Sequence, residues 1–351
     1  MGSRLIASRF LRFLHTFGNI SRAKVQDAGQ LAFHHMIGAD PLWRGAPCPI
    51  KQVLPPEAEC RTVEEGDQMV TLINTPVGSL RFAHVKSDSA GETAFLIEHP
   101  LKSEEDYKVQ MWIEEHTVYL PDPEAVQAHL QGDGREGLSL GMLMPRGKSA
   151  YQFMVEHLAG TEELIYAQMD FPDTVRSLWE IMVAKDLEVV KMALESDYDY
   201  FLTFEDSSTQ NYSPVQYDDF IGSEIGQWTQ LLDHAGKRYV QHACGHIDAL
   251  IEKMPAHGTF AVESLSPPPT GNLSVKDARA KVGERLGIIG GIEPTEFLNR
   301  EGDELDRYVE SVIEDAQGGP FVLANSDSCP PGVTVEKFKQ VADIARLEER
   351  V

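Results

Sequence analysis

The residues that point most directly to chemistry are a histidine and two cysteines. His242 and Cys244 stand at the end of a strand-like run, directly before Gly245, and Cys329 follows a second such run. In an extended segment residues i and i+2 point to the same side, so His242 and Cys244 can both reach one ion. An imidazole and two thiolates suit the borderline softness of zinc, and a catalytic zinc keeps one position for substrate. These three residues therefore predict an open zinc site.

A second interpretation is structural, because free cysteines usually pack as small hydrophobic side chains. The strand-end position of all three residues favours the metal site, since catalytic groups of a β/α barrel sit where strands end and loops begin. Other polar residues end or directly follow the strand-like runs, namely Glu205, Asp206, Glu263 and Asp327. Glu263 or Glu205 is expected to fill the fourth zinc position or to handle a proton. Asp206, Tyr212 and Asp327 are expected to line the cavity, although Glu205 and Asp206 can also be solvated carboxylates at a loop start.

Alternating strands and helices must hold these residues in place. Short apolar runs recur from about residue 135 onward, over 138–144, 200–204, 238–242, 259–263, 286–290 and 321–325. Helical patterns separate several of them, over 173–196, 214–235 and 302–317. Runs that are apolar on both faces belong in a parallel sheet covered by helices. With a further strand near Pro49-Ile50, the strand count approaches the eight of a closed α/β barrel.

The rest of the chain is expected to extend this barrel. Residues 1–46 are predicted to form a helical N-terminal extension that ends in a turn. The barrel is then expected over 47–351, with a β-hairpin or three-stranded insert at about 65–100. No internal repeat, low-complexity tract or flexible linker demands a second independently folding domain.

Composition and charge limit the class of partner. The chain of 351 residues carries 31 Lys plus Arg against 55 Asp plus Glu, a formal charge of −24. Such a field repels phosphate backbones and anionic lipids, so neither nucleic acid nor a membrane is an expected partner. The chain contains no apolar run long enough for a membrane-spanning helix. Its four cysteines are too few for a disulfide-stapled secreted scaffold, so a reducing cytoplasm is the expected location.

Several stretches resemble the uroporphyrinogen decarboxylase superfamily, and within it the zinc-dependent, corrinoid-linked methyltransferase branch of coenzyme M methyltransferases and O-demethylase methyltransferases. The most specific is the His-X-Cys-Gly element at 242–245 together with the distant Cys329. The supporting stretches are 75–80, 263–273, 289–294 and 325–334. This resemblance covers most of the chain from about 60 to 345. It implies a (β/α)8 TIM barrel with an N-terminal helical extension.

The resemblance also implies a reaction. Zinc held by His242, Cys244 and Cys329 would serve to move a methyl group between a corrinoid (methylcobalamin or cob(I)alamin) and a thiol, methyl ether or related small molecule. The chain lacks the Asp-X-His-X-X-Gly element by which corrinoid-binding domains ligate cobalt. The corrinoid is therefore expected on a separate partner protein or as free cofactor.

Two other functions stay open. The first is metal-free decarboxylation of the uroporphyrinogen decarboxylase type, against which the lack of an arginine-rich signature in residues 1–46 argues. The second is a barrel that has lost catalysis and binds a ligand, against which the complete histidine and cysteine set argues. The sequence also leaves the oligomeric state open, a homo-oligomer included.

Overall fold

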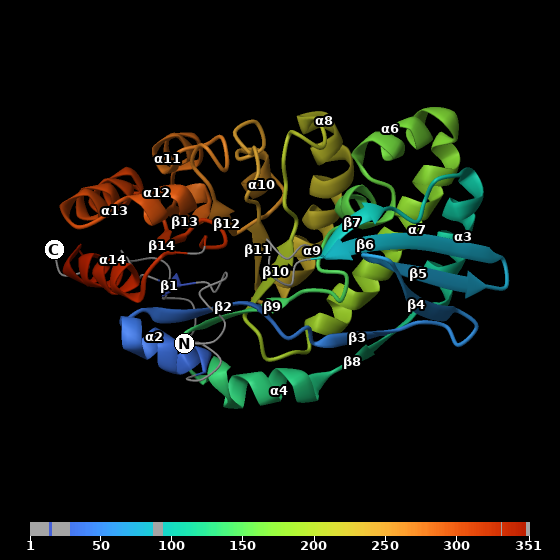
Figure 1. The fold of residues 1–351 in the computed structure, drawn as a ribbon, viewed down its shortest axis with the longest axis horizontal. Coiled ribbons are helices and arrows are strands. Elements are labelled where there is room, and N and C mark those ends of the chain that lie inside the picture. The colour runs from blue at the N-terminus through green and yellow to red at the C-terminus, as the bar shows by residue number, and fades with distance from the viewer. Residues whose placement is uncertain (1–13, 16–28, 87–93, 331, 349–351) are drawn as a thin grey trace. The chain divides into compact units, whose positions relative to one another are not determined.

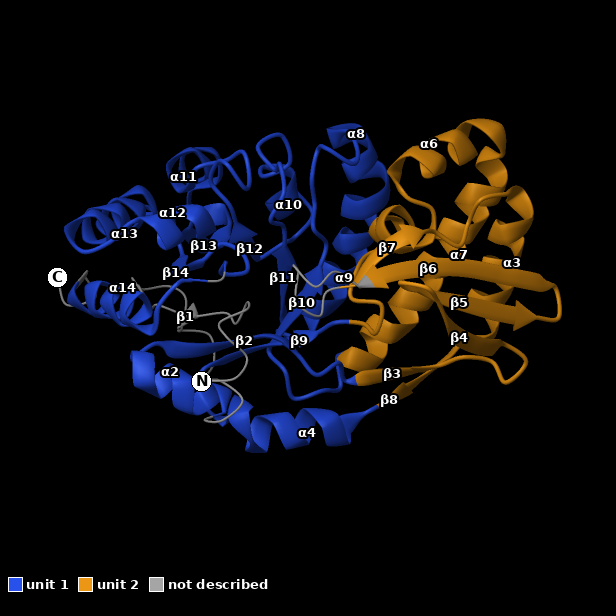
Figure 2. Cartoon of the chain, in the orientation of Figure 1, with its two compact units in different colours: residues 1–49, 122–143, 194–351 blue, residues 50–121, 144–193 orange. Residues whose placement is uncertain are grey.

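The chain divides into two compact units, each made of separate chain segments (Figure 2). The computed structural model describes residues 14–15, 29–86, 94–330 and 332–348. Unit 1 comprises residues 1–49, 122–143 and 194–351, and unit 2 comprises residues 50–121 and 144–193. Unit 1 carries a parallel sheet, and unit 2 carries two antiparallel sheets, one of four strands and one of two.

A parallel sheet forms the centre of unit 1 (Figure 1). Seven of its strands lie side by side in chain order, namely β2 (Asp40–Ala46), β9 (Leu138–Met142), β10 (Tyr200–Phe204), β11 (Arg238–His242), β12 (Ala261–Leu265), β13 (Gly287–Ile292) and β14 (Phe321–Asn325). The two residues of β1 (Leu14–His15) pair with β2. Every pairing is parallel, so all strands end at the same edge of the sheet.

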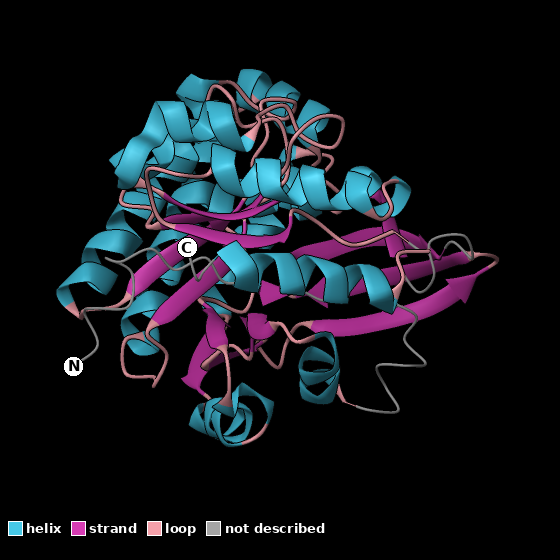
Figure 3. Ribbon diagram, turned by 90° about the vertical axis from the view of Figure 1, so that its left-hand side faces the viewer, coloured by secondary structure: helices cyan, strands magenta, loops and turns pink. Residues whose placement is uncertain are grey.

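Helices alternate with these strands along the chain. Figure 3 distinguishes the helices in cyan from the strands in magenta. In unit 1 the helices are α2 (Gln30–Ile37), α4 (Pro123–Gln131), α8 (Pro214–Gln216), α9 (Ser223–His234), α10 (Lys253–Ala256), α11 (Val275–Val282), α12 (Pro294–Asn299), α13 (Asp303–Asp315) and α14 (Val335–Glu348). A π-helical segment (Tyr217–Gly222) joins α8 to α9. Trp228 of α9 packs edge-on against Tyr239 of β11, which places α9 on the outer face of the sheet.

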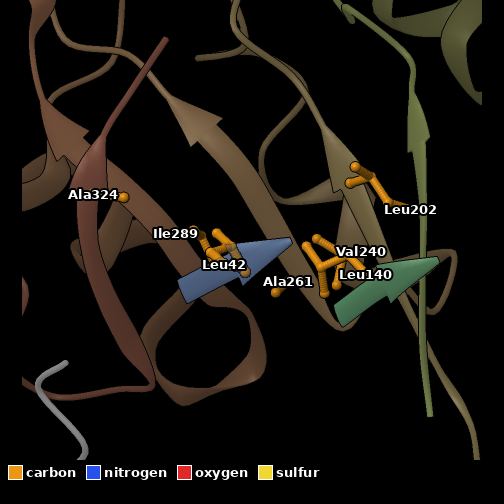
Figure 4. Packing of buried hydrophobic residues seen from close by; sticks show 7 residues of the cluster. All are labelled: Leu42, Leu140, Leu202, Val240, Ala261, Ile289 and Ala324. Carbon is orange, nitrogen blue, oxygen red and sulfur yellow. The ribbon is translucent and has the colours of Figure 1, made fainter. Parts of the chain in front are cut away.

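The sheet curls around an apolar core. One buried side chain from each of seven strands joins the central cluster, namely Leu42, Leu140, Leu202, Val240, Ala261, Ile289 and Ala324 (Figure 4). The short strand β1 pairs with β2, and its Cα atoms come within 8 Å of those of β14, at the other end of the strand order. The predicted barrel is thus confirmed as a curled parallel sheet. Hydrogen-bonded closure of eight strands stays a prediction, because no pairing of β14 with β1 is found among the described residues.

The predicted strands over 200–204, 238–242 and 321–325 are confirmed residue for residue. The expectation of a barrel strand near Pro49-Ile50 is wrong, because β3 (Ile50–Val53) belongs to unit 2 and pairs antiparallel with β8 (Val118–Pro121). The first long barrel strand is β2, inside the segment predicted to be helical. The stretch 37–41 gave that segment the pattern of a turn, but at Asp40 and Pro41 burial in the sheet outweighs this local preference. The part of the predicted helical extension that covers residues 1–28 lies outside the described residues, apart from Leu14 and His15.

Unit 2 contains the predicted insert with one strand more than expected. Its antiparallel sheet consists of β4 (Glu59–Glu65), β5 (Gln68–Thr75), β6 (Gly78–Lys86) and β7 (Ala94–Glu98). Its helices are α3 (Glu104–His116), α5 (Ala150–Phe153), α6 (Thr161–Asp170) and α7 (Pro172–Ala193), with a π-helical segment (Met154–Leu158) after α5. The division of the chain at residue 46 stays a prediction. Among the described residues, no helix is long and apolar enough to cross a membrane.

Candidate metal centre

The carboxyl ends of four parallel strands carry the polar residues of the site. Along each strand successive side chains alternate between the two faces of the sheet. Val240 and Ala261 face the apolar core, so His242 and Glu263, two positions further on, share that inner face. His242 and Glu263 are also register partners in neighbouring strands. On the inner face, each of these two strands therefore carries an apolar residue in the core and, two positions further on, a polar residue at the edge of the sheet.

Asp206, His242 and Cys244 form a compact group of potential metal ligands. One ligand atom from each lies within 4.8 Å of the other two. Asp206 Oδ1 is 3.0 Å from His242 Nε2 and 3.5 Å from Cys244 Sγ. His242 is buried, whereas Asp206 and Cys244 are partly exposed. The i, i+2 spacing therefore places the side chains of His242 and Cys244 close together, and the carboxylate of Asp206 lies beside them.

Two loops that are tied together hold this group. The backbone N–H of His246 donates to Ser208 Oγ (3.1 Å), and that of Thr209 donates to the carbonyl of His246 (2.9 Å). Gly245 is needed at this contact, because a Cβ there would lie 2.6 Å from the Cβ of Ser208. Asp206 has a φ of 45°, in the left-handed region that a non-glycine residue rarely adopts. The surrounding contacts keep this strained residue, and its carboxylate, directed at His242.

A carboxylate and a guanidinium lie on the other side of the imidazole. Glu263 Oε2 is 2.5 Å from His242 Nδ1, and Arg44 Nε of β2 is 3.3 Å from the same Glu263 oxygen. In sheet order β2 and β12 are four strands apart, about 19 Å in a flat sheet, so the contact requires the curl. Arg44 was missed in the sequence because it lies in the segment predicted to be helical.

The charges around His242 act on each other. Burial alone would lower the pKa of His242, but the carboxylates of Glu263 and Asp206 outweigh burial and hold it well above its usual range. Burial would likewise raise the pKa of Glu263, but Arg44 and His242 outweigh it and keep that pKa low. For Cys244, burial raises the thiol pKa, and His242 only partly offsets the effect. The carboxylates of the site therefore stabilise a positive charge at the buried imidazole.

The donor set of this group fits zinc. One imidazole nitrogen, one thiol sulfur and one carboxylate oxygen are all ligands that zinc accepts in proteins. Glu263 matches the carboxylate that commonly receives the second ring N–H of a metal-binding histidine. On this arrangement Nε2 faces the metal position and Nδ1 faces Glu263.

Glu205 and Tyr212 lie elsewhere. Glu205 is fully buried and accepts a hydrogen bond from Thr203 Oγ1 (2.7 Å), which also contacts the hydroxyl of Tyr239 (2.5 Å). Those residues occupy the outer face of the sheet, under α9. Tyr212 is buried beside Ser207, and burial raises its pKa well above the usual value. Neither belongs to the group around Asp206.

Asp327 and Cys329 follow β14. Cys329 is buried, and burial together with the Asp327 carboxylate raises the pKa of its thiol to about 12. Asp327 also raises the pKa of Cys244, so its charge reaches the site. Among the described residues, Cys329 is not a member of the compact ligand group. Its role as third zinc ligand stays a prediction.

Comparison with solved structures finds a similar fold. A methyltransferase from Methanosarcina mazei has a TM-score of 0.60 and 13% sequence identity, covering 98% of this chain and 95% of that chain. A B12-independent methionine synthase from Shewanella sp. W3-18-1, in complex with selenomethionine, has a TM-score of 0.46 and 9% identity, covering 94% of this chain and 87% of its own. No family model and no curated protein sequence matches the chain. At 13% identity, the likeness to the first of these proteins supports the fold of this chain.

Proposed function

We propose that the chain is a zinc-dependent methyltransferase that moves a methyl group between a corrinoid and a small thiol, methyl ether or related compound. The observation that carries the proposal is the convergence of Asp206, His242 and Cys244 at the carboxyl edge of a curled parallel sheet. This edge is where barrel enzymes build their active sites. The likeness in fold to a methyltransferase agrees with it.

The residues divide into ligands and supports. His242 would give Nε2, Cys244 its sulfur and Asp206 one carboxylate oxygen, and we propose Cys329 as a further ligand. Bound zinc would stabilise negative charge on the sulfur or oxygen atom that gains or loses the methyl group. The carboxylate of Glu263 lies against the second ring nitrogen of His242. A free thiol has a pKa of about 8.5 and is mostly protonated at neutral pH, so activation of a thiol acceptor is needed.

The methyl carrier is proposed to arrive from outside the chain. A corrinoid on a separate protein would meet the site from the carboxyl edge, where Asp206 and Cys244 are partly exposed. Glu205 and Tyr212 are buried and would support the loop at 205–208 rather than contact substrate. We propose Asp327 as a residue near the cavity whose charge acts on Cys244.

Metal analysis tests the zinc centre. Wild type purified without chelator and supplied with zinc should retain about one zinc per chain, and H242A and C244A should lose it. The variant C60A is the matched control, because Cys60 is an exposed cysteine of unit 2. C329A shows whether that cysteine is a ligand. The zinc centre would be contradicted if wild type retained no zinc. It would also be contradicted if H242A and C244A both kept full zinc occupancy.

Corrin spectroscopy tests the methyl transfer. Wild type mixed with methylcobalamin and a panel of thiols, or with cob(I)alamin and a panel of methyl donors, should change the corrin spectrum, and C244A should not. If zinc binds but no partner gives a change, methyl transfer is rejected and a ligand-binding barrel is favoured. Decarboxylation of a porphyrinogen by metal-free protein would instead favour the decarboxylase.

A further inference from the structure

Arg44 occupies a position that neither zinc ligation nor methyl transfer explains directly. It follows Leu42 on the inner face of β2, and its side chain is 18% exposed. Arg44 Nε lies 3.3 Å from Glu263 Oε2, and Arg44 Nη2 lies 3.2 Å from His242 Nδ1. Its guanidinium also stacks above the ring of Phe204, 5.0 Å from the centroid. One guanidinium therefore contacts both members of the carboxylate and imidazole pair.

A bulge in β2 aims this side chain. The register between β2 and β9 shifts between Arg44 and Ala46, so that Gly45 is an extra residue. Gly45 has a φ of 68°, and a Cβ there would lie 3.2 Å from the ring of Phe204. Bulges of this kind redirect side chains beside active sites, and the left-handed backbone favours glycine. The sequence Arg44-Gly45 thus delivers a cation to the site.

Glu263 links Arg44 to His242. Its Oε2 meets both Arg44 Nε and His242 Nδ1, and its Oε1 accepts from Ser264 Oγ (3.1 Å). The side chain of Glu263 is 1% exposed, so its partners in the structure are protein groups rather than bulk water. A buried carboxylate needs such partners to keep one position. The direction of the imidazole therefore depends on a residue that is 198 positions away in the chain.

We propose that Arg44 is a positioning residue: it fixes Glu263, and Glu263 fixes His242 with Nε2 directed at Asp206 and Cys244. The effect on the imidazole follows from these contacts alone. The effect on zinc rests on the proposed function. Outer partners of a metal-binding histidine typically change metal affinity by about 10- to 100-fold.

The first measurement uses metal-free protein. A hydrogen bond from His242 Nδ1–H to Glu263 should give a proton NMR signal far downfield, assigned by its loss in H242Q and its persistence in D206N, which changes only the partner of Nε2. The signal should persist in wild type, disappear in R44M, and return in part in R44K, which keeps the charge but lacks the planar guanidinium that lies against Glu263. The matched control is R238M. Arg238 starts β11, pairs with Asp233 Oδ1 at 2.9 Å and lies over the ring of Phe260.

The second measurement is zinc affinity by competition with a coloured chelator, on variants whose near-ultraviolet circular dichroism matches wild type. R44M should bind zinc about 10- to 100-fold more weakly than wild type, R44K should lie between them, and R238M should be unchanged. If R44M does not fold, R44K alone must show both effects. Unchanged NMR signal and affinity in R44M and R44K, or an equal loss in R238M, would overturn the role of Arg44. If wild type binds no zinc, the proposed function fails, whereas the NMR signal still decides the role of Arg44.

Discussion

Asp206 and Glu205 are neighbours in the chain but lie in different surroundings. Asp206 Oδ1 contacts His242 and Cys244 on the inner side of the sheet edge. Glu205 shares a face with Thr203, which donates to it from within the outer layer. The left-handed φ of Asp206 accompanies this change of direction. At the scale of single residues, face and backbone conformation therefore separate a candidate ligand from a structural carboxylate.

This difference predicts opposite results for two isosteric substitutions. D206N should weaken zinc binding about tenfold or more, because a neutral amide is a poorer ligand than a carboxylate. E205Q is the matched control and should change zinc affinity by less than about twofold, since Glu205 lies outside the ligand group. Chelator competition measures both. If E205Q lost more zinc affinity than D206N, then Glu205 rather than Asp206 would be the carboxylate that faces the metal position.

At the scale of elements, unit 2 is joined by a buried cluster of charges. Arg146 Nη2 lies 3.0 Å from Glu114 Oε2 of α3, and Arg146 Nε lies 3.0 Å from Asp186 Oδ1 of α7. All three side chains are at most 6% exposed. Glu114 comes from one chain segment of unit 2, and Arg146 and Asp186 come from the other. The cluster therefore connects the two chain segments of unit 2 through buried charges.

Loss of this arginine should destabilise the protein strongly. R146M leaves two buried carboxylates without their shared cation, which should lower the free energy of unfolding by about 3–5 kcal/mol. The control is R81M in the same unit, because the Arg81–Glu98 pair is more exposed and should contribute less than about 1 kcal/mol. Urea unfolding measures the loss, and hydrogen exchange should locate it in α3 and α7. Equal effects of R146M and R81M would contradict the importance of the cluster.

At the scale of the whole molecule, the dominant property is the formal charge of −24. An excess of one sign destabilises a compact chain through self-repulsion. Dissolved salt screens exposed charges far more than buried pairs such as Arg44 and Glu263. Added salt should therefore relieve the repulsion while leaving the site intact.

Metal-free protein should accordingly melt at a higher temperature in more salt. Raising NaCl from about 0.01 M to about 0.15 M shortens the screening length from about 30 Å to about 8 Å. The rise in melting temperature at neutral pH should shrink near the isoelectric point of about 4.8, where the net charge vanishes. Calorimetry at both pH values provides the comparison. A melting temperature that falls with salt at neutral pH would mean that attractive surface pairs outweigh the repulsion.

The sequence by itself determined six of the seven long parallel strands, three of them to the residue, and the pairing of His242 with Cys244. Both follow from local rules, the apolar runs of buried strands and the two-residue repeat of side-chain direction.

Only the tertiary structure decided that Asp206 joins them, that Glu205 lies on the other face and that Arg44 reaches Glu263. These contacts depend on the curl of the sheet, the bulge at Gly45 and the left-handed turn at Asp206. No local pattern encodes them, because each one is fixed by packing between strands that are far apart in the chain.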